Sequence, residues 1–272
     1  MTMDYLYYLR RDKMPHIWCD GCGHGIILKS ILRCIDKMGW DKNDIALVSG
    51  IGCSSRTPGY VDFNTLHTTH GRALAFATGL KIAKPNLHVI VVSGDGDATA
   101  IGGNHFIHAA RRNIDITMII YNNYIYGMTG GQVSPTTPAH KKATTAPYGN
   151  PDEPFDISRL AQSAGAIYVA RSTVFHVARM DKYIESALNR TGFSVVEILT
   201  PCPTSYGRRN KEGRGVDMLM YQKSNSIGIE RAKNMSAEEL VGKIVTGVFA
   251  DKGQESYLNR YNEVIEKARK GT

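Results

Sequence analysis

Two apolar strands joined by a helix constrain the fold of this chain more than any other feature. LHVIVVSGDGD (87–97) and IDITMIIYNN (114–123) are nearly unbroken apolar runs, and GGNHFIHAARRN (102–113) between them has a helical pattern. Continuously apolar strands are buried on both faces, which is typical of a parallel sheet. Strand, helix and strand in this order predict a right-handed βαβ unit. The chain is therefore expected to have an α/β fold.

The same alternation continues on both sides of this unit. Helices are expected over 25–40 and 71–85, with an apolar strand near 45–55, and a strand–helix–strand pattern resumes within 164–203. These segments predict a doubly wound parallel sheet with helices on both faces. About thirty residues rich in Gly, Pro, Ser and Thr interrupt the pattern at 124–154. Long irregular stretches inside a compact domain are usually functional.

The length of 272 residues predicts one main domain with an extension. Residues 1–203 are expected to form the main domain, and the more polar residues 204–272 a helical C-terminal extension that packs on this domain or on a partner subunit. Within the extension, helices are expected at 237–249 and 256–270.

Polar side chains stand at the ends of two consecutive strands of the predicted sheet. Asp95 follows the first strand between Gly94 and Gly96, and the pair Asn122-Asn123 ends the next. A carboxylate at the carboxyl end of a parallel strand needs a partner, and oxygen ligands of this kind suit Mg²⁺ together with a phosphate. The alternative is that Asp95 caps the helix near residue 102 and that the asparagines form a turn. The occurrence of both features at adjacent strand ends favours the metal.

Four of the five cysteines lie in loops. Cys19 and Cys22 form a CxxC within WCDGCGHG, and Cys53 and Cys202 have Gly- or Pro-rich surroundings. No strand precedes the CxxC, which argues against a thioredoxin-like pair. Four thiolates suit a zinc ion or an iron–sulfur cluster equally. Cys34 lies on the apolar stripe of its helix and is expected to be a core residue.

Taken together, the motifs resemble those of a known enzyme family. GDGDA followed by IIYNN resembles the thiamine diphosphate motif, which opens with GDG and closes with NN. With WCDGCGHG, SGIGCSS, YGMTGGQVSPTTP and TPCPTSYGRRN, in this order over about residues 14–210, the chain resembles the β subunit of 2-oxoacid:ferredoxin oxidoreductases. HTTHGRALAFATG and the last two motifs are most similar to the 2-oxoglutarate branch. The pyruvate and branched-chain 2-oxoacid enzymes share most of these motifs, and a non-redox thiamine enzyme subunit with structural zinc is a further alternative.

The resemblance implies how the metals are held. It implies that Asp95, Asn123 and the backbone carbonyl of Ile125 hold Mg²⁺, which anchors the diphosphate of thiamine diphosphate. It also implies one four-iron four-sulfur cluster near that cofactor, and the implied cluster ligands are Cys19, Cys22, Cys53 and Cys202.

The resemblance further implies a set of residues around the cofactor. They are Ile51, Gly52, Cys53, Ser54, His70, Gly94, Asp95, Gly96, Asp97, Asn123, Ile125, Tyr126, Gly127, Met128 and Thr129. Among them His70, Met128 and Thr129 are the implied catalytic residues, with His70 pointing towards the diphosphate or the substrate. Some relatives carry a lysine in the loop where this chain has Gly130-Gly131, so Arg72 is a candidate to bind the substrate carboxylate instead.

Size and charge indicate the partners. The family's catalytic glutamate comes from a separate pyrimidine-binding domain, for which this chain has no room, so the resemblance implies an α subunit and an αβ or α2β2 assembly. The net charge of +8 fits an acidic ferredoxin and the anionic coenzyme A. The basic residues are scattered without a nucleic-acid motif, and no apolar run approaches the length of a membrane helix, so neither a nucleic acid nor a membrane is expected as a partner. The absence of a signal-peptide pattern favours the cytoplasm.

Overall fold

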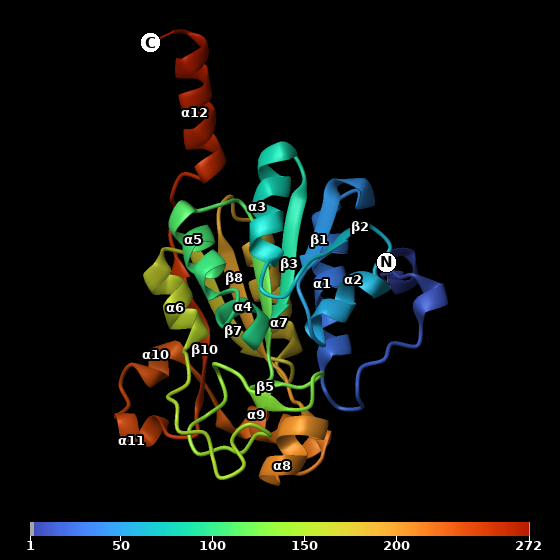
Figure 1. The fold of residues 1–272 in the computed structure, drawn as a ribbon, viewed down its shortest axis with the longest axis vertical. Helices are drawn as coiled ribbons and strands as arrows, with labels where there is room; N and C mark the ends of the chain where they lie inside the picture. Colours follow the sequence, from blue (N-terminus) through green and yellow to red (C-terminus); the bar gives the residue numbers. More distant parts are fainter. Residues whose placement is uncertain (1–2, 272) are drawn as a thin grey trace.

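The computed structural model describes residues 3–271, and its centre is an eight-stranded sheet in the order β2-β1-β3-β4-β8-β7-β10-β9 (Figure 1). The strands are β1 Ile45–Ser49, β2 Asn64–His67, β3 His88–Gly94, β4 Thr117–Asn122, β7 Tyr168–Thr173, β8 Ser194–Leu199, β9 Ser226–Gly228 and β10 Ile244–Asp251. All neighbouring strands are parallel except β10 and β7, which pair antiparallel. The predicted α/β fold with a parallel sheet is confirmed.

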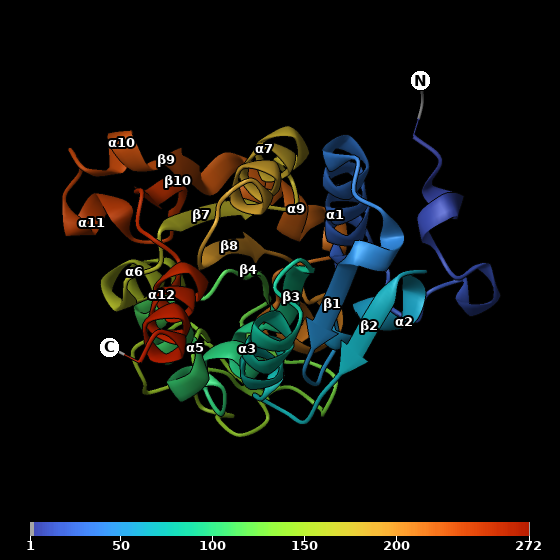
Figure 2. The same cartoon turned by 90° about the horizontal axis from the view of Figure 1, so that it is seen from above.

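Helices cover both faces of the sheet, as Figure 2 shows from above. The helices are α1 His24–Met38, α2 Thr57–Tyr60, α3 Ala73–Ala83, α4 Asp95–Thr99, α5 Gly103–Arg112, α6 Ile157–Ala164, α7 Val177–Leu188, α8 Arg208–Asn210, α9 Gly215–Asn225, α10 Ile229–Ala232, α11 Ala237–Leu240 and α12 Tyr257–Arg269. One apolar core lies between the sheet and α1 and α7, and a second lies between the sheet and α3, α5 and α6. Because each face of the sheet has its own apolar core and its own helices, the predicted doubly wound arrangement is confirmed.

Sequence periodicity placed the central elements correctly. The helix predicted over 25–40 is α1, which ends at Gly39 in the left-handed region with φ of 66°. The cysteine at position 34 is buried in the first core, as expected, and its Sγ lies 3.3 Å from the carbonyl oxygen of Asp181. The predicted βαβ unit is formed by β3, α5 and β4, with β3 and β4 parallel.

The C-terminal extension differs from the expectation. The helix predicted over 237–249 is wrong, because this segment forms only the short α11 and then β10. The β-branched residues of IVTGVF suit a strand, and β10 pairs with β7 at the end of the sheet. The helix predicted at 256–270 is α12, which extends away from the body at the end opposite the 124–154 loop (Figure 1). The division of the chain into a main domain, 1–203, and an extension, 204–272, stays a prediction. Residues 1, 2 and 272 lie outside the described residues.

The segment from 124 to 154 folds back over the carboxyl ends of the strands. It contains one small hairpin, β5 Ile125–Tyr126 with β6 Gln132–Val133, and otherwise has no regular structure. Asn150 is buried, and its Nδ2 donates to the carbonyl oxygens of Thr137 at 2.9 Å and Asp152 at 3.1 Å. Asn150 therefore links two parts of the loop to each other.

Candidate active site

A cavity lies at the edge of the sheet where β3 and β4 end. All residues that the resemblance implied around the cofactor line it, namely Ile51, Gly52, Cys53, Ser54, His70, Gly94, Asp95, Gly96, Asp97, Asn123, Ile125, Tyr126, Gly127, Met128 and Thr129. His24 and Tyr121 also line it. Sequence reasoning missed these two because each stands beside an apolar run that predicts core packing.

Asp95 is the buried carboxylate of this cavity. Its Oδ2 accepts hydrogen bonds from Ser134 Oγ at 2.5 Å and Thr136 Oγ1 at 2.6 Å. Burial raises the pKa of Asp95, and the two hydroxyl hydrogen bonds oppose that rise. The alternative role as a helix cap is wrong, because α5 begins after Gly102 without a side-chain cap.

Ser134 and Thr136 were not identified individually from the sequence. Both belong to the stretch VSPTTP of the 124–154 loop, and both are buried. The motif drew attention to the segment, but a hydroxyl that contacts a carboxylate is indistinguishable in sequence from one that only forms a turn. The structure thus joins this loop to the acidic turn after β3.

The side chains of Asn122, the last residue of β4, and of Asn123 point in different directions. Asn123 lines the cavity, and its Oδ1 accepts from the backbone N–H of Ile125 at 3.3 Å. Asn122 instead donates from Nδ2 to Glu197 Oε1 at 2.8 Å. The cavity therefore contains the carboxylate of Asp95 and the amide of Asn123 together with Ile125. Oxygen atoms of these types are those that Mg²⁺ prefers, so the residues present fit that ion.

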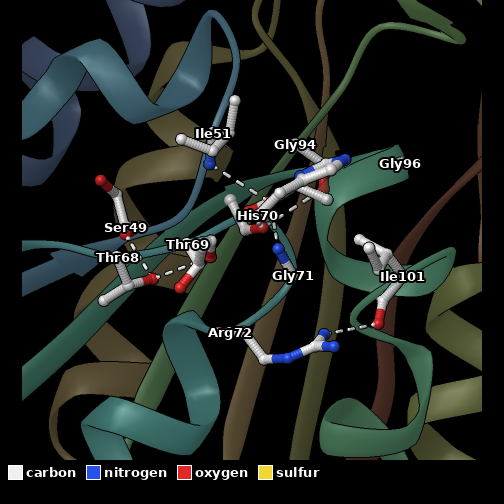
Figure 3. A network of polar contacts seen from close by, with 12 residues as sticks. Ser49, Ile51, Thr68, Thr69, His70, Gly71, Arg72, Gly94, Gly96 and Ile101 are labelled. Atoms are coloured by element: carbon white, nitrogen blue, oxygen red, sulfur yellow. Dashed lines mark hydrogen bonds and ion pairs between the residues drawn. The ribbon is translucent and has the colours of Figure 1, made fainter.

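Asp97 connects two loops that border the cavity. Its Oδ1 accepts from the backbone N–H of Gly71 at 2.7 Å and of Ile51 at 3.2 Å, and Oδ2 accepts from Ser93 Oγ at 2.6 Å. Oδ1 also lies 2.5 Å from His70 Nδ1, and Figure 3 shows Ile51, His70 and Gly71 close together in this network. Asp97 therefore fixes the loops that follow β1 and β2.

His70 is held by the same carboxylate. Its Nδ1 lies 2.5 Å from Asp97 Oδ1, and its side chain is about one third exposed beside the cavity. Arg72 does not line the cavity; its guanidinium donates to the carbonyl oxygen of Ile101 at 3.1 Å (Figure 3). The structure thus lends no support to Arg72 as the group that binds a substrate carboxylate.

Gly96 allows a close contact that any side chain would prevent. A Cβ at this position would lie 2.3 Å from Cζ of Tyr126, and the Tyr126 hydroxyl donates to the Gly96 carbonyl at 3.1 Å. Burial raises the pKa of Tyr126 to about 12, so this phenol keeps its proton. The ring therefore packs directly on the backbone of the acidic turn.

Ser54 leaves a hydrogen-bonding group for a polar ligand. Its Oγ is buried and without a partner in the described part of the chain, and the residue lines the cavity beside Gly94. An unpaired buried hydroxyl costs free energy unless a ligand or water satisfies it. The unpaired hydroxyl and the oxygen ligands together fit a diphosphate-bearing cofactor with its metal.

The four predicted cluster cysteines line a second cavity. Cys19 and Cys22 come from the loop before α1, Cys53 from the loop after β1 and Cys202 from the loop after β8. All are free thiols. A Cβ on Gly127 would lie 3.3 Å from Cys202 Sγ and 3.9 Å from Cys53 Sγ, so a glycine here leaves room beside the sulfurs. These cysteines fit one shared cluster.

The thiols do not by themselves distinguish zinc from an iron–sulfur cluster. Over residues 3–271, no three or more His, Cys, Asp and Glu side chains are grouped closely enough to hold a metal ion. Burial raises the pKa of Cys22 and of Cys53 to about 11, so these thiols keep their protons until a metal displaces them.

The two cavities share a wall. His24, Cys53, Asn123, Gly127 and Met128 line both of them. His24 packs between Trp18 and Tyr121, and burial lowers its pKa to about 4, so its imidazole is neutral. A cofactor in the first cavity and a cluster in the second would therefore be neighbours.

This fold and this cavity are those of a thiamine-dependent enzyme. The family model "Thiamine pyrophosphate enzyme, C-terminal TPP binding domain" matches residues 50–198, which begin directly after β1 and include β2, β3, β4, β7 and all of β8 but its last residue. None of the helices described over residues 3–271 is long and apolar enough to span a membrane.

Full-length relatives place the chain more narrowly. It is 52% identical to the 2-oxoglutarate synthase subunit KorB of Methanocaldococcus jannaschii, with 96% of this chain and 97% of that protein covered. It is 49% identical to the subunit of the same name of Archaeoglobus fulgidus, over 100% of this chain and 98% of that protein. The chain belongs to this family of KorB β subunits.

A solved structure is similar over nearly the whole chain. It is the 2-oxoglutarate:ferredoxin oxidoreductase from Magnetococcus marinus with 2-oxoglutarate, coenzyme A and succinyl-CoA bound. The sequence identity is 34% and the TM-score 0.86, over 98% of this chain and 91% of that chain. The identification suggested by the motifs is confirmed.

Proposed function

We propose that this chain is the β subunit of an enzyme that decarboxylates 2-oxoglutarate oxidatively to succinyl-CoA, with coenzyme A and ferredoxin, or runs the reverse CO₂-fixing reaction. The identity to KorB subunits supports the substrate. The observation that carries the proposal is the wall shared by the Asp95 cavity and the four-cysteine cavity. A non-redox decarboxylase has no use for a cluster beside its cofactor, whereas an oxidoreductase must remove electrons from it.

Asp95, Asn123 and the carbonyl of Ile125 would hold Mg²⁺ and through it the cofactor's diphosphate. Bound thiamine diphosphate supplies the carbanion-stabilising group for decarboxylation. The Ser54 hydroxyl is free to donate to that diphosphate, and Gly96 lets the Tyr126 ring pack on the turn that carries Asp95. The remaining residues that line the cavity would exclude water and fix the cofactor's orientation.

His70, Met128 and Thr129 are proposed to contact the reacting groups. The Nδ1 of His70 is bound to Asp97, which leaves Nε2 for the cofactor or substrate. Met128 is about half exposed at the mouth of both cavities. The Thr129 hydroxyl donates to Gln132 Oε1 at 2.7 Å, so it would have to exchange this partner for a ligand.

Cys19, Cys22, Cys53 and Cys202 are proposed to ligate one four-iron four-sulfur cluster. Their position supports electron transfer out of the cofactor cavity one electron at a time, because Cys53 contributes to both cavities. Five cysteines, an odd number, do not indicate a disulfide framework, which supports a cytoplasmic location. The net charge of +8 supports an acidic ferredoxin as electron acceptor.

An α subunit is proposed to complete the site. The cofactor cavity has a volume of about 140 Å³, whereas pockets that enclose a small ligand measure roughly 300–1,000 Å³. A second wall from the α subunit, carrying the glutamate for the aminopyrimidine, would enclose the cofactor in an αβ or α2β2 assembly. Residues 204–272 already pack on the main domain through the pairing of β10 with β7, and the rest of this segment is proposed to contact the partner.

Anaerobic co-purification with the partner tests the proposal. We expect a brown complex that reduces ferredoxin with 2-oxoglutarate and coenzyme A, more efficiently than with pyruvate or 2-oxoisovalerate. Preference for another 2-oxoacid would reassign the substrate within the family. A colourless, zinc-loaded complex that decarboxylates without reducing ferredoxin would overturn the proposal.

A further inference from the structure

Asn122 begins the turn that presents the proposed Mg²⁺ ligands. Its Oδ1 accepts from the backbone N–H of Tyr124 at 3.2 Å, and the next residue repeats the pattern towards Ile125. Tyr124 has a φ of 65°, a conformation that costs a residue other than glycine free energy and must be held by its surroundings. The Asn122 side chain is one of the groups that hold it.

The orientation of the Asn122 amide is decided by Glu197. A carboxylate can only accept, so the Nδ2 group of Asn122 faces Glu197 Oε1 and its Oδ1 faces Tyr124. Thr136 Oγ1 lies 2.9 Å from the same Oδ1 and 2.6 Å from Asp95 Oδ2. The orientation of the Asn122 amide therefore affects the turn that carries Asn123 and Ile125 and also the hydroxyl that binds Asp95.

Glu197 is paired with a buried arginine. On neighbouring parallel strands, Arg171 and Glu197 are register partners, and Arg171 Nε donates to Glu197 Oε2 at 2.7 Å. Glu197 is 2% exposed and Arg171 is 8% exposed. Ser158 Oγ donates to the same oxygen at 2.6 Å, and Asp156 also accepts from Arg171. Buried charges of this kind are costly unless fully paired, so their presence next to the metal site calls for a function.

We propose that Glu197 is a positioning residue for the Mg²⁺–diphosphate site, acting through Asn122. Replacement by glutamine keeps the shape but changes the hydrogen-bonding groups. The Gln oxygen would face the Arg171 guanidinium and its NH2 group would face Asn122. To accept from this NH2 group, the Asn122 amide would have to turn its Oδ1 towards residue 197. Its Nδ2 group would then face the Tyr124 N–H, and because both are donors, neither would have an acceptor. The turn would relax, and Asn123 and Ile125 would move.

The inference rests on the proposed function, and one titration series tests both. The Mg²⁺ concentration that gives half-maximal thiamine diphosphate binding is measured by calorimetry on the complex with its partner subunit. Failure of the wild type to bind contradicts the proposed function. With a binding wild type, we expect Glu197→Gln to raise the Mg²⁺ requirement about tenfold, the usual effect of a residue that orients a metal ligand, and saturating Mg²⁺ to restore binding.

Asp156→Asn is the matched control. This substitution removes the other carboxylate from Arg171, but Asp156 does not contact Asn122. We expect a lower melting temperature with an unchanged Mg²⁺ requirement. An equal rise of the Mg²⁺ requirement in Asp156→Asn and Glu197→Gln would show that both act only through stability, and would overturn the inference.

A double-mutant cycle tests the route through Asn122. If Glu197 acts through this amide, Glu197→Gln adds little to the effect of Asn122→Ala, so the two effects are not additive. Additive effects would overturn the inference. Asn122→Ala alone tests the same link if the Glu197 variant does not fold, and an unchanged Mg²⁺ requirement in it would contradict the proposal.

Discussion

At the scale of single residues, Gly96 offers a direct test of the cofactor cavity. Alanine there would place Cβ 2.3 Å from the Tyr126 ring. We expect Gly96→Ala to lower the free energy of unfolding by about 1–3 kcal/mol, as overpacking does, and to weaken cofactor binding. Chemical denaturation and calorimetry measure the two effects.

The same substitution at Gly79 is its control. Gly79 lies exposed in α3 with nothing near its missing Cβ. We expect Gly79→Ala to stabilise the protein by about 0.5–1 kcal/mol and to leave cofactor binding unchanged. Equal behaviour of the two alanine variants would argue against tight packing of Tyr126 on Gly96.

Asp95 and Cys53 are expected to have separable roles although they line the same cavity. We predict that Asp95→Ala abolishes retention of thiamine diphosphate and keeps the cluster, whereas Cys53→Ser loses the cluster. Cofactor content after gel filtration and visible absorption under anaerobic conditions measure both. A variant of Asp95 that lost its cluster and retained its cofactor would reverse the assignment.

The residues of the site differ in how well the sequence predicted them. Asp95 and Asn123 were predicted because polar residues at two adjacent strand ends have few structural explanations. Ser134, Thr136 and Glu197 were not, because their roles depend on contacts between segments far apart in the chain. Asp97 has backbone partners from two different loops, which only the folded chain brings together.

At the scale of elements, the 124–154 loop is predicted to depend on Asn150. Asn150→Ala would leave the carbonyls of Thr137 and Asp152 without their donor, at a cost of about 1–3 kcal/mol. We expect faster proteolysis within 138–150 and slower proteolysis when Mg²⁺ and thiamine diphosphate are added. Limited proteolysis with mass spectrometry measures this.

Asn189→Ala is the control for this experiment. Asn189 is exposed at the end of α7, and its side chain donates a hydrogen bond to the Glu185 carbonyl at 2.9 Å. We expect unchanged proteolysis of the loop and a stability within about 0.5 kcal/mol of the wild type. Cleavage of both variants at the wild-type rate would contradict the role given to Asn150.

Periodicity predicted most elements of the sheet and failed where two patterns compete. The residues of α1 and of β4 have only one plausible period each, and both elements were predicted. The segment 237–249 combines helix-forming residues at its start with β-branched residues at its end, and the antiparallel pairing of β10 with β7 decides its structure. Such pairing between distant segments is absent from a local pattern.

At the scale of the whole molecule, the chain is predicted to be inactive alone. Its own cavity is too small to enclose a cofactor, and the proposed glutamate belongs to the partner. We expect no ferredoxin reduction by the isolated chain, and activity on addition of the α subunit. Full activity of the isolated chain, freed of any co-purified partner, would contradict the proposed division of the site.

The central claim is that electrons pass from the cofactor cavity to a cluster held by this chain. The most direct test mixes the anaerobic complex rapidly with 2-oxoglutarate and coenzyme A in the absence of ferredoxin and follows the visible absorption of the cluster. The shared wall of the two cavities predicts bleaching in the wild type and none in Asp95→Ala. Release of CO₂ with a cluster absorption that stays unchanged would contradict the account.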